Sequence, residues 1–334
     1  TYAKDVQLAS LEIDNFKRLD RLALSFLQQD GTPRPLTLIA GAGGTGKTTV
    51  LQAIALVLSL ATWRTASPGA FAWPGFSSVR LSSRGPTRVA LTVHFDEDEQ
   101  AAIGAAYAAW AKRGARGDEA LLAMAKPLLA PRVRLVFEDG ALHFPDGRGA
   151  EGQFLGRSFL RAVHQEDRAA LRQTLSTLGD VFWFDEHRSL GTRLIGGRGT
   201  DLARVERLFA ELWPGVCLED LTPPVARALP GACEHLDLCA RRGDLRYDVA
   251  ELSAGEKDAL FLLHGCAVDV STRSVVLIDE VALHLHPPQQ QALLSALRRL
   301  APSCQFLVTT RSDAAAQVVP TDDIVRLLGE PSCP

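Results

Sequence analysis

The sequence has no run of about 20 consecutive apolar residues, which is the length that a helix needs to cross a bilayer. Its longest apolar stretch, residues 50–61, is too short for that. No leader segment is recognisable either. We therefore expect a cytoplasmic protein without a membrane partner.

An excess of charge of one sign is also lacking. Basic side chains number 36 and acidic side chains 39, so the net charge is −3. This balance does not by itself call for nucleic acid, although it leaves room for a local basic patch. Five arginines either form such a patch or are solvated surface residues, and charge patterning favours the second interpretation. They are Arg188, Arg193, Arg198, Arg204 and Arg207.

The six cysteines lack the spacing of a disulfide framework. One group, Cys233, His235 and Cys239, has residue types that bind zinc, but it lies in an alternating, strand-like stretch without paired Cys-x-x-Cys motifs. His284 and His286 likewise lack a third metal ligand nearby. We expect buried, reduced thiols and structural histidines.

Alternating strand and helix patterns predict an α/β fold with a mainly parallel sheet flanked by helices. We expect three parts. Residues 1–95 form an N-terminal lobe that begins with an antiparallel strand pair, and residues 96–180 form a mostly helical insertion. Residues 181–334 form the C-terminal lobe. The insertion contains one predicted hairpin, which turns at Asp139-Gly140. Repeats and sustained heptads are absent.

A glycine-rich loop between a predicted strand and a predicted helix is the clearest functional motif. Residues 41–48, GAGGTGKT, fit the Walker A pattern G-x-x-x-x-G-K-[ST]. Glycines let backbone N–H groups turn inward around phosphates, and the following helix points its positive end at them. Lys47 is expected to reach the β- and γ-phosphates, and Thr48 to bind Mg²⁺. The expected ATP-binding residues are Gly41, Ala42, Gly43, Gly44, Thr45, Gly46, Lys47, Thr48 and Thr49.

A second motif, SVVLIDE, is an apolar strand that ends in two acids, which is the Walker B arrangement. Asp279 is expected to hold Mg²⁺, directly or through water. Glu280 is expected to orient the attacking water, because phosphoryl transfer depends on positioning and charge. Both motifs occur in one chain, which favours this interpretation over solvated acids at a strand end.

The segment LSAGE, Leu252–Glu256, lies between these two motifs and directly before an apolar helix. By itself it is a plausible helix cap, because Ser253 and Glu256 have the spacing of a capping box. Between Walker A and Walker B it resembles the LSxGE signature motif of ABC-type ATPases.

Two further stretches resemble one branch of these ATPases. The run IDEVALHLHPPQQQALLSAL resembles the DEPxxHLHP segment of the ATPase heads of overcoming-lysogenization-defect proteins and related chromosome-maintenance ATPases. The opening LASLEIDNFKRLDRLALSF resembles their N-terminal strand pair. The likeness covers residues 1–60 and 230–315 and is poor in between.

This resemblance implies an ABC-type P-loop fold in which two heads sandwich two ATP molecules, with Mg²⁺ as cofactor. It implies a homodimer in the ATP state. The signature residues then act in trans, on the γ-phosphate that the partner's Walker A loop holds. They are Ser253, Ala254, Gly255 and Glu256.

The chain departs from the family pattern in several places. Relatives have Thr-His-Ser after the strand that follows Walker B, and this chain has Thr310-Arg311-Ser312. Arg311 either replaces the histidine as a catalytic cation or marks slow turnover. Val281 and Ala282 stand where Pro and Glu are usual, and the expected loop glutamine is not identifiable in residues 76–100. Arg188 is a candidate contact to DNA or nucleotide.

We therefore expect an ATPase that dimerises head to head on ATP and drives or gates a DNA-processing or antiviral-defence partner. The alternative is a non-hydrolysing, ATP-dependent switch that binds an effector protein. Little sequence follows the last predicted ATPase strand, so we expect no nuclease domain in this chain and a separate effector protein. Double-stranded DNA stays open as a partner.

Overall fold

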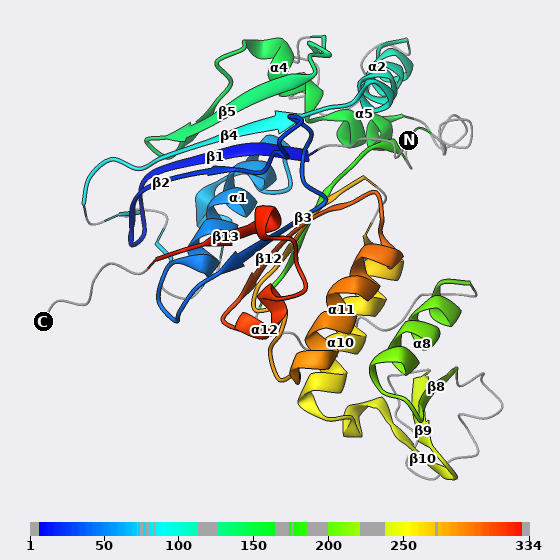
Figure 1. Cartoon of the computed structure of the whole chain (residues 1–334). Coiled ribbons are helices and arrows are strands. Elements are labelled where there is room, and N and C mark those ends of the chain that lie inside the picture. The colour runs from blue at the N-terminus through cyan, green and yellow to red at the C-terminus, as the bar shows by residue number, and fades with distance from the viewer. Residues whose placement is uncertain are drawn as a thin grey trace, which may run out of the picture.

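The computed structural model of the chain describes residues 7–71, 73, 76–77, 81–82, 84–112, 126–163, 174, 177–185, 200–220, 238–270 and 273–328. Their strands form one five-stranded antiparallel sheet, one five-stranded parallel sheet and one three-stranded antiparallel sheet. The two large sheets lie on either side of helix α1, Lys47–Ala61 (Figure 1). This is the predicted α/β architecture.

The antiparallel sheet begins with the predicted N-terminal strand pair. Strands β1 (Gln7–Phe16) and β2 (Leu19–Ser25) pair directly, and β4 (Arg88–His94) pairs with the other side of β1. Strands β5 (Arg132–Glu138) and β6 (Ala141–His143) complete the order β2-β1-β4-β5-β6. The hairpin predicted at Asp139-Gly140 joins β5 to β6 and is confirmed.

The predicted insertion does not stand apart from the N-terminal sheet. Strand β5 pairs with β4 along its whole length, so residues inside 96–180 extend that sheet. Helices α2 (Glu97–Ala111), α4 (Arg148–Gln153) and α5 (Gly156–Ala162) lie beside it (Figure 1). Asp96 caps α2, because its side chain accepts a hydrogen bond from the Glu99 backbone N. The sequence pattern predicted the hairpin. The sheet to which it belongs is decided by the pairing of β5 with β4, a strand that is distant in the sequence.

The parallel sheet has the order β13-β3-β12-β11-β7. Its central strands are apolar and buried on both faces, as expected for a covered parallel sheet. The carboxyl ends of β3, β11 and β12 share one edge, which is where open α/β sheets bind ligands. The bounds are β3 Leu36–Ala40, β7 Val181–Phe184, β11 Val275–Ile278, β12 Gln305–Thr310 and β13 Ile324–Arg326.

Helix α1 is buried almost all round, because it contacts both large sheets. The other face of the parallel sheet is covered by helices α8 (Thr200–Leu212), α10 (Ala254–His264) and α11 (Pro287–Leu300) (Figure 1). Two hydrophobic cores result, one on each side of the sheet.

The remaining elements are short. Strands β8 (Val216–Asp220), β9 (Leu238–Arg242) and β10 (Leu245–Asp248) form the small sheet beside α8. One π-helical turn, Gly265–Asp269, follows α10, and α12 spans Asp313–Ala316. Single 3-10 turns occupy Pro68–Ala70, Val249–Glu251 and Thr321–Asp323. Across the described ranges, no helix combines the length and apolarity needed to span a membrane.

Candidate functional site

The predicted Walker A loop connects the carboxyl end of β3 to the start of α1. Two of its glycines are required by the geometry. Gly46 has φ +94°, a left-handed conformation, and a Cβ there would lie 2.6 Å from Leu19 Cδ2. A Cβ on Gly41 would lie 2.7 Å from the Leu327 carbonyl oxygen. Strands β2 and β13 therefore enclose the loop.

Lys47 lies within this loop and is only 4% exposed. Its Nζ donates to the carbonyl oxygens of Gly41 at 2.9 Å and Ala42 at 3.0 Å. It also lies 3.6 Å from Glu280 Oε1. The structure thus brings the Walker A lysine and the predicted catalytic carboxylate together from positions more than 200 residues apart.

Thr309, on β12, positions both Walker B acids at the end of β11. Its Oγ1 donates to Asp279 Oδ1 at 2.5 Å and accepts from the Glu280 backbone N at 2.8 Å. Glu280 itself has φ +48°, so the chain bends sharply after Asp279. Both acids are buried. Sequence reasoning did not single out Thr309, since its partners are set by the pairing of β11 with β12.

Arg311 reaches the same carboxylate. Its Nε donates to Glu280 Oε1 at 2.9 Å, while the Arg311 side chain stays 61% exposed and that of Glu280 is 8% exposed. A Cβ on Gly43 would lie 3.9 Å from Arg311 Nη1, so the guanidinium also borders the Walker A loop. An exposed cation and a buried carboxylate therefore meet beside the Walker A loop.

The turn between β1 and β2 adds two basic residues that sequence reasoning treated only as a turn. Arg18 Nη1 would lie 3.7 Å from a Cβ on Gly44. Lys17, at φ +52°, donates from Nζ to Gln52 Oε1 on α1 at 2.8 Å, and burial lowers its pKa. One indication of these contacts was present in the sequence, namely two adjacent basic residues directly after Phe16, the last residue of β1.

The two expected magnesium ligands are Thr48 and Asp279. Thr48 lies in the first turn of α1 beside the buried Lys47, and Asp279 ends the neighbouring strand β11. Among the described residues, no group of three or more His, Cys, Asp or Glu could hold a metal by itself. One hydroxyl and one carboxylate suit Mg²⁺, which is usually held by few protein ligands together with phosphates and water.

The signature segment caps helix α10. Ser253 Oγ donates to Glu256 Oε2 at 2.7 Å, and the Ser253 backbone N donates to the same oxygen at 2.8 Å. Ser253 Oγ also accepts from the Glu256 backbone N at 3.3 Å, and together with the Ser253 backbone bond this forms the capping box that the sequence predicted. Arg242, from β9, adds a hydrogen bond to Glu256 Oε1 at 3.1 Å. Ser253 and Ala254 are exposed, and α10 begins beside the three-stranded sheet, away from α1 (Figure 1).

The loop after the Walker B acids contacts the start of helix α10 and, through Gln290 of α11, the residue that follows Arg311. A Cβ on Gly255 would lie 2.4 Å from the His284 carbonyl oxygen, so only glycine permits this approach. Buried Gln290 donates to the Leu285 carbonyl at 2.7 Å and accepts from Ser312 Oγ at 2.6 Å. The predicted structural role of the HLHP segment is consistent with this packing.

Several predicted residues lie outside the described residues, namely Arg188, Arg193, Arg198, Cys233, His235 and Cys333. The described cysteines form no disulfide with one another; Cys239, Cys266 and Cys304 are buried, and Cys217 is exposed. Burial raises the pKa of Cys239. These observations agree with buried thiols at three positions.

Two family models match the chain. One covers residues 145–315, just over half of the chain, and is described as "AAA domain, putative AbiEii toxin, Type IV TA system". The other, described as an AAA domain, matches residues 10–104. Together they include both Walker motifs and the signature segment.

Two curated relatives share part of this region. "Retron Ec83 probable ATPase" of Escherichia coli is 32% identical over 100 residues, which is 27% of this chain and 18% of that protein. "Septu protein PtuA" of Bacillus thuringiensis is 27% identical over 89 residues, 23% of this chain and 22% of that protein. The match therefore spans about a fifth of the length of these relatives.

Solved structures of SMC heads resemble the whole fold. The SmcHead bound to the C-winged helix domain of ScpA has a TM-score of 0.58 at 17% identity, over 96% of this chain and 97% of that one. A Pyrococcus furiosus Smc head bound to the C-terminal domain of ScpA has a TM-score of 0.53 at 14% identity, over 96% and 93%. At such identities the likeness shows the fold alone.

These comparisons support the coarser part of the sequence-based assignment, an AAA/ABC-type ATPase, while membership of the overcoming-lysogenization-defect group stays a prediction. The chain belongs to the AAA-domain family whose model matches residues 145–315, and it has the ABC-type P-loop ATPase fold.

Proposed function

We propose that this chain binds ATP with Mg²⁺ and hydrolyses it at a site that two copies complete head to head. One observation carries the proposal. Lys47, Glu280 and Arg311 form one cluster at the edge of the parallel sheet, whereas Ser253 is exposed in a different part of the chain. A second copy is the simplest source of a signature serine for that cluster.

The cluster explains how nucleotide would be held. Backbone N–H groups of the Walker A loop and the start of α1 bind phosphate oxygens, and Lys47 turns from the loop carbonyls to the β- and γ-phosphates. Thr48 and Asp279 hold the cation. When bound, Mg²⁺ would supply positive charge that offsets the negative charge developing during phosphoryl transfer.

Glu280 is the residue that would orient the attacking water. In the structure its Oε1 lies beside both Lys47 and Arg311. A γ-phosphate carries more negative charge than one carboxylate, so it draws both cations toward itself. Glu280 is thereby released to accept a hydrogen bond from water. Arg311 would contact both Glu280 and the phosphate. It would therefore supply a cation at the position where histidine is usual.

Across the dimer, Ser253 and the N-terminal end of α10 would face the partner's γ-phosphate. The Ser253 hydroxyl donates to Glu256 in the single chain and would rotate toward the phosphate in the dimer. Glu256 alone would repel that phosphate. Arg242 offsets its charge and keeps the carboxylate within the cap.

The dimer would drive or gate a separate effector in DNA processing or antiviral defence, and similarity to retron and Septu proteins supports a defence role. Double-stranded DNA and the contact through Arg188 stay predictions. Duplex affinity measured at several salt concentrations tests them, because phosphate-driven binding must weaken steeply with salt. Absence of binding at low salt would remove DNA from the partner list.

The central experiment measures molar mass by light scattering and ATP turnover together. Glu280→Gln should retain ATP and form a stable dimer, because it slows hydrolysis and leaves the phosphate contacts in place. Lys47→Ala should remain monomeric. If wild-type turnover does not exceed that of Glu280→Gln while dimers still form, the protein is the non-hydrolysing switch instead.

A further inference from the structure

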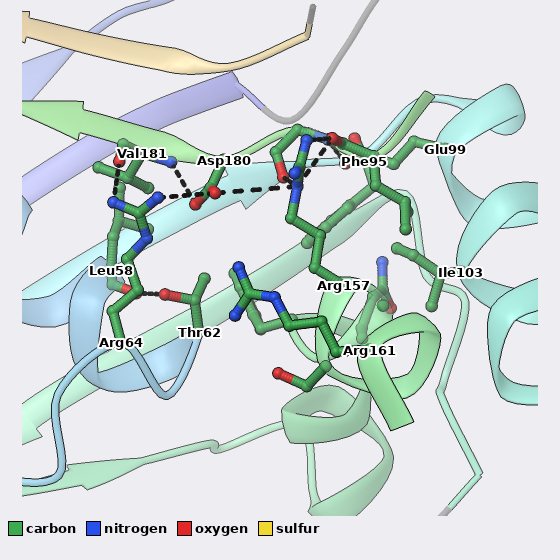
Figure 2. Close-up of a pocket in the computed structure, with 16 residues that line it drawn as sticks. Leu58, Thr62, Arg64, Phe95, Glu99, Ile103, Arg157, Arg161, Asp180 and Val181 are labelled. Carbon is green, nitrogen blue, oxygen red and sulfur yellow. Dashed lines mark hydrogen bonds and ion pairs between the residues drawn. The ribbon is translucent and has the colours of Figure 1, made fainter. Parts of the chain in front are cut away.

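A pocket rich in arginine lies at the far end of helix α1 from the Walker A loop. Its walls come from the end of α1, from α2 and α5, and from the start of β7 (Figure 2). Along α1, the first residue that lines the pocket is Leu58, 11 positions after Lys47, which corresponds to about 16 Å at about 1.5 Å per residue. The two sites are therefore separate.

Among the described residues, three guanidinium groups and two carboxylates line the pocket. The cations are Arg64, Arg157 and Arg161, and the acids are Glu99 and Asp180. Figure 2 shows the Arg161 guanidinium in the open space between the other two arginines. Apolar side chains, among them Leu58 and Ile103, form other parts of the lining.

Two of the arginines are held in place by the protein. Arg64 donates to Asp180 Oδ2 and to the Val181 carbonyl, both at 2.7 Å. Arg157 Nε donates to the carbonyl oxygens of Leu178 at 3.1 Å and Gly179 at 3.0 Å. Its Nε lies farther from Asp180, at 3.9 Å. Their positions are thus fixed before any ligand arrives.

Arg161 follows Arg157 by four residues on α5, so both project from one face of that helix. Like charges at this spacing repel each other. Burial lowers the pKa of Arg157, Asp180 raises it, and the positive charges of Arg161 and Arg64 lower it further. An anion placed among the three guanidinium groups would turn this repulsion into attraction.

We propose that this pocket binds the phosphate group of a small ligand, independently of the ATP site. The planar, forked guanidinium is well suited to phosphate oxygens, and three of them border one space. The apolar part of the lining would contact the body of the ligand. Free phosphate and a phosphate ester share the same recognition chemistry, so the probes must separate them.

The test uses calorimetric titration of the full chain in the Lys47→Ala background, which should weaken phosphate binding at the Walker A loop. Inorganic phosphate and phenyl phosphate are the two probes, at constant ionic strength. We expect saturable binding of one site per chain. Tighter binding of phenyl phosphate would identify a ligand with an apolar body, and equal binding would identify phosphate alone as the determinant.

Arg161→Ala should weaken phosphate binding about tenfold or more, which is the loss expected from one charged hydrogen bond. Arg161→Gln, which keeps much of the side-chain length, should do the same, so a folding defect in one variant leaves the test intact. Arg21→Ala removes an exposed arginine on β2 and should leave affinity unchanged. Absence of saturable binding, or full affinity in both Arg161 variants, would overturn the proposal.

Discussion

Arg311 donates a 2.9 Å hydrogen bond to the buried carboxylate of Glu280, from a side chain that is itself mostly exposed. The pair joins the residue expected to orient water with a cation that borders the Walker A loop at Gly43. It offers a physical explanation for an arginine where related heads carry histidine. Its charge is permanent, so the contact should be insensitive to pH.

Replacing this cation should slow the chemical step. We expect Arg311→Ala to lower kcat by about 10²-fold, the loss seen when one preorganised electrostatic contact is removed, with a smaller change in KM. Arg311→His should restore part of the rate and add pH dependence. Its imidazole, with an ordinary pKa of about 6.5, loses its charge as pH rises, so the rate should fall between about pH 6 and 8. Wild-type turnover by Arg311→Ala would show that the contact has no catalytic role.

Mixing two inactive variants tests whether Ser253 acts in trans. Lys47→Ala lacks phosphate binding, and Ser253→Arg places a bulky cation at the start of α10. Each should be inactive alone. A mixed dimer has one site with an intact Lys47 from one copy and an intact Ser253 from the other, so ATP turnover should reappear on mixing. Continued inactivity of mixtures in which heterodimers are detected would contradict the shared site.

Gln290 should connect the loop after Walker B to the segment after β12. Gln290→Leu leaves the buried Leu285 carbonyl without this donor, which should reduce the free energy of unfolding by about 1–3 kcal/mol. Ser312→Ala should have only a small additional effect in that background, because the bond between the two side chains is already lost and only its N-cap contact to Ala315 remains to be removed. Denaturant titration measures both. Gln29→Leu, at an exposed position, is the matched control and should change stability by about 0.5 kcal/mol or less.

Arg242 should support the signature cap through charge. Arg242→Gln leaves Glu256 without its external cation, so the ATP-bound dimer should dissociate several-fold more readily, and the difference should shrink at high salt. Arg246→Gln removes a neighbouring arginine that pairs with Glu219 instead, and it should leave dimerisation unchanged. Sedimentation in the presence of ATP compares the two variants. Equal dimer stability would assign Arg242 a purely structural role.

Much of the fold follows from local pattern. The apolar run Leu36–Ala40, the glycine loop and the periodic helix after it predicted β3, the Walker A loop and α1 in the places where the structure has them. The capping box at Ser253 was likewise readable, because its partners lie within one turn. Such features depend on residues that are close together in the sequence, so the amino-acid sequence alone is enough to predict them.

Other features depend on which distant strands become neighbours. The sequence by itself determined the phosphate loop, the two Walker B acids and the alternation that makes an α/β protein. Only the tertiary structure decided that β5 joins the N-terminal sheet, that Thr309 positions Asp279 and Glu280, and that three arginines border one pocket. The physical reason is the distance along the sequence between the residues that interact. A loop or cap is stabilised by bonds within a few residues, whereas these contacts exist only after sheet order and helix packing bring remote segments together.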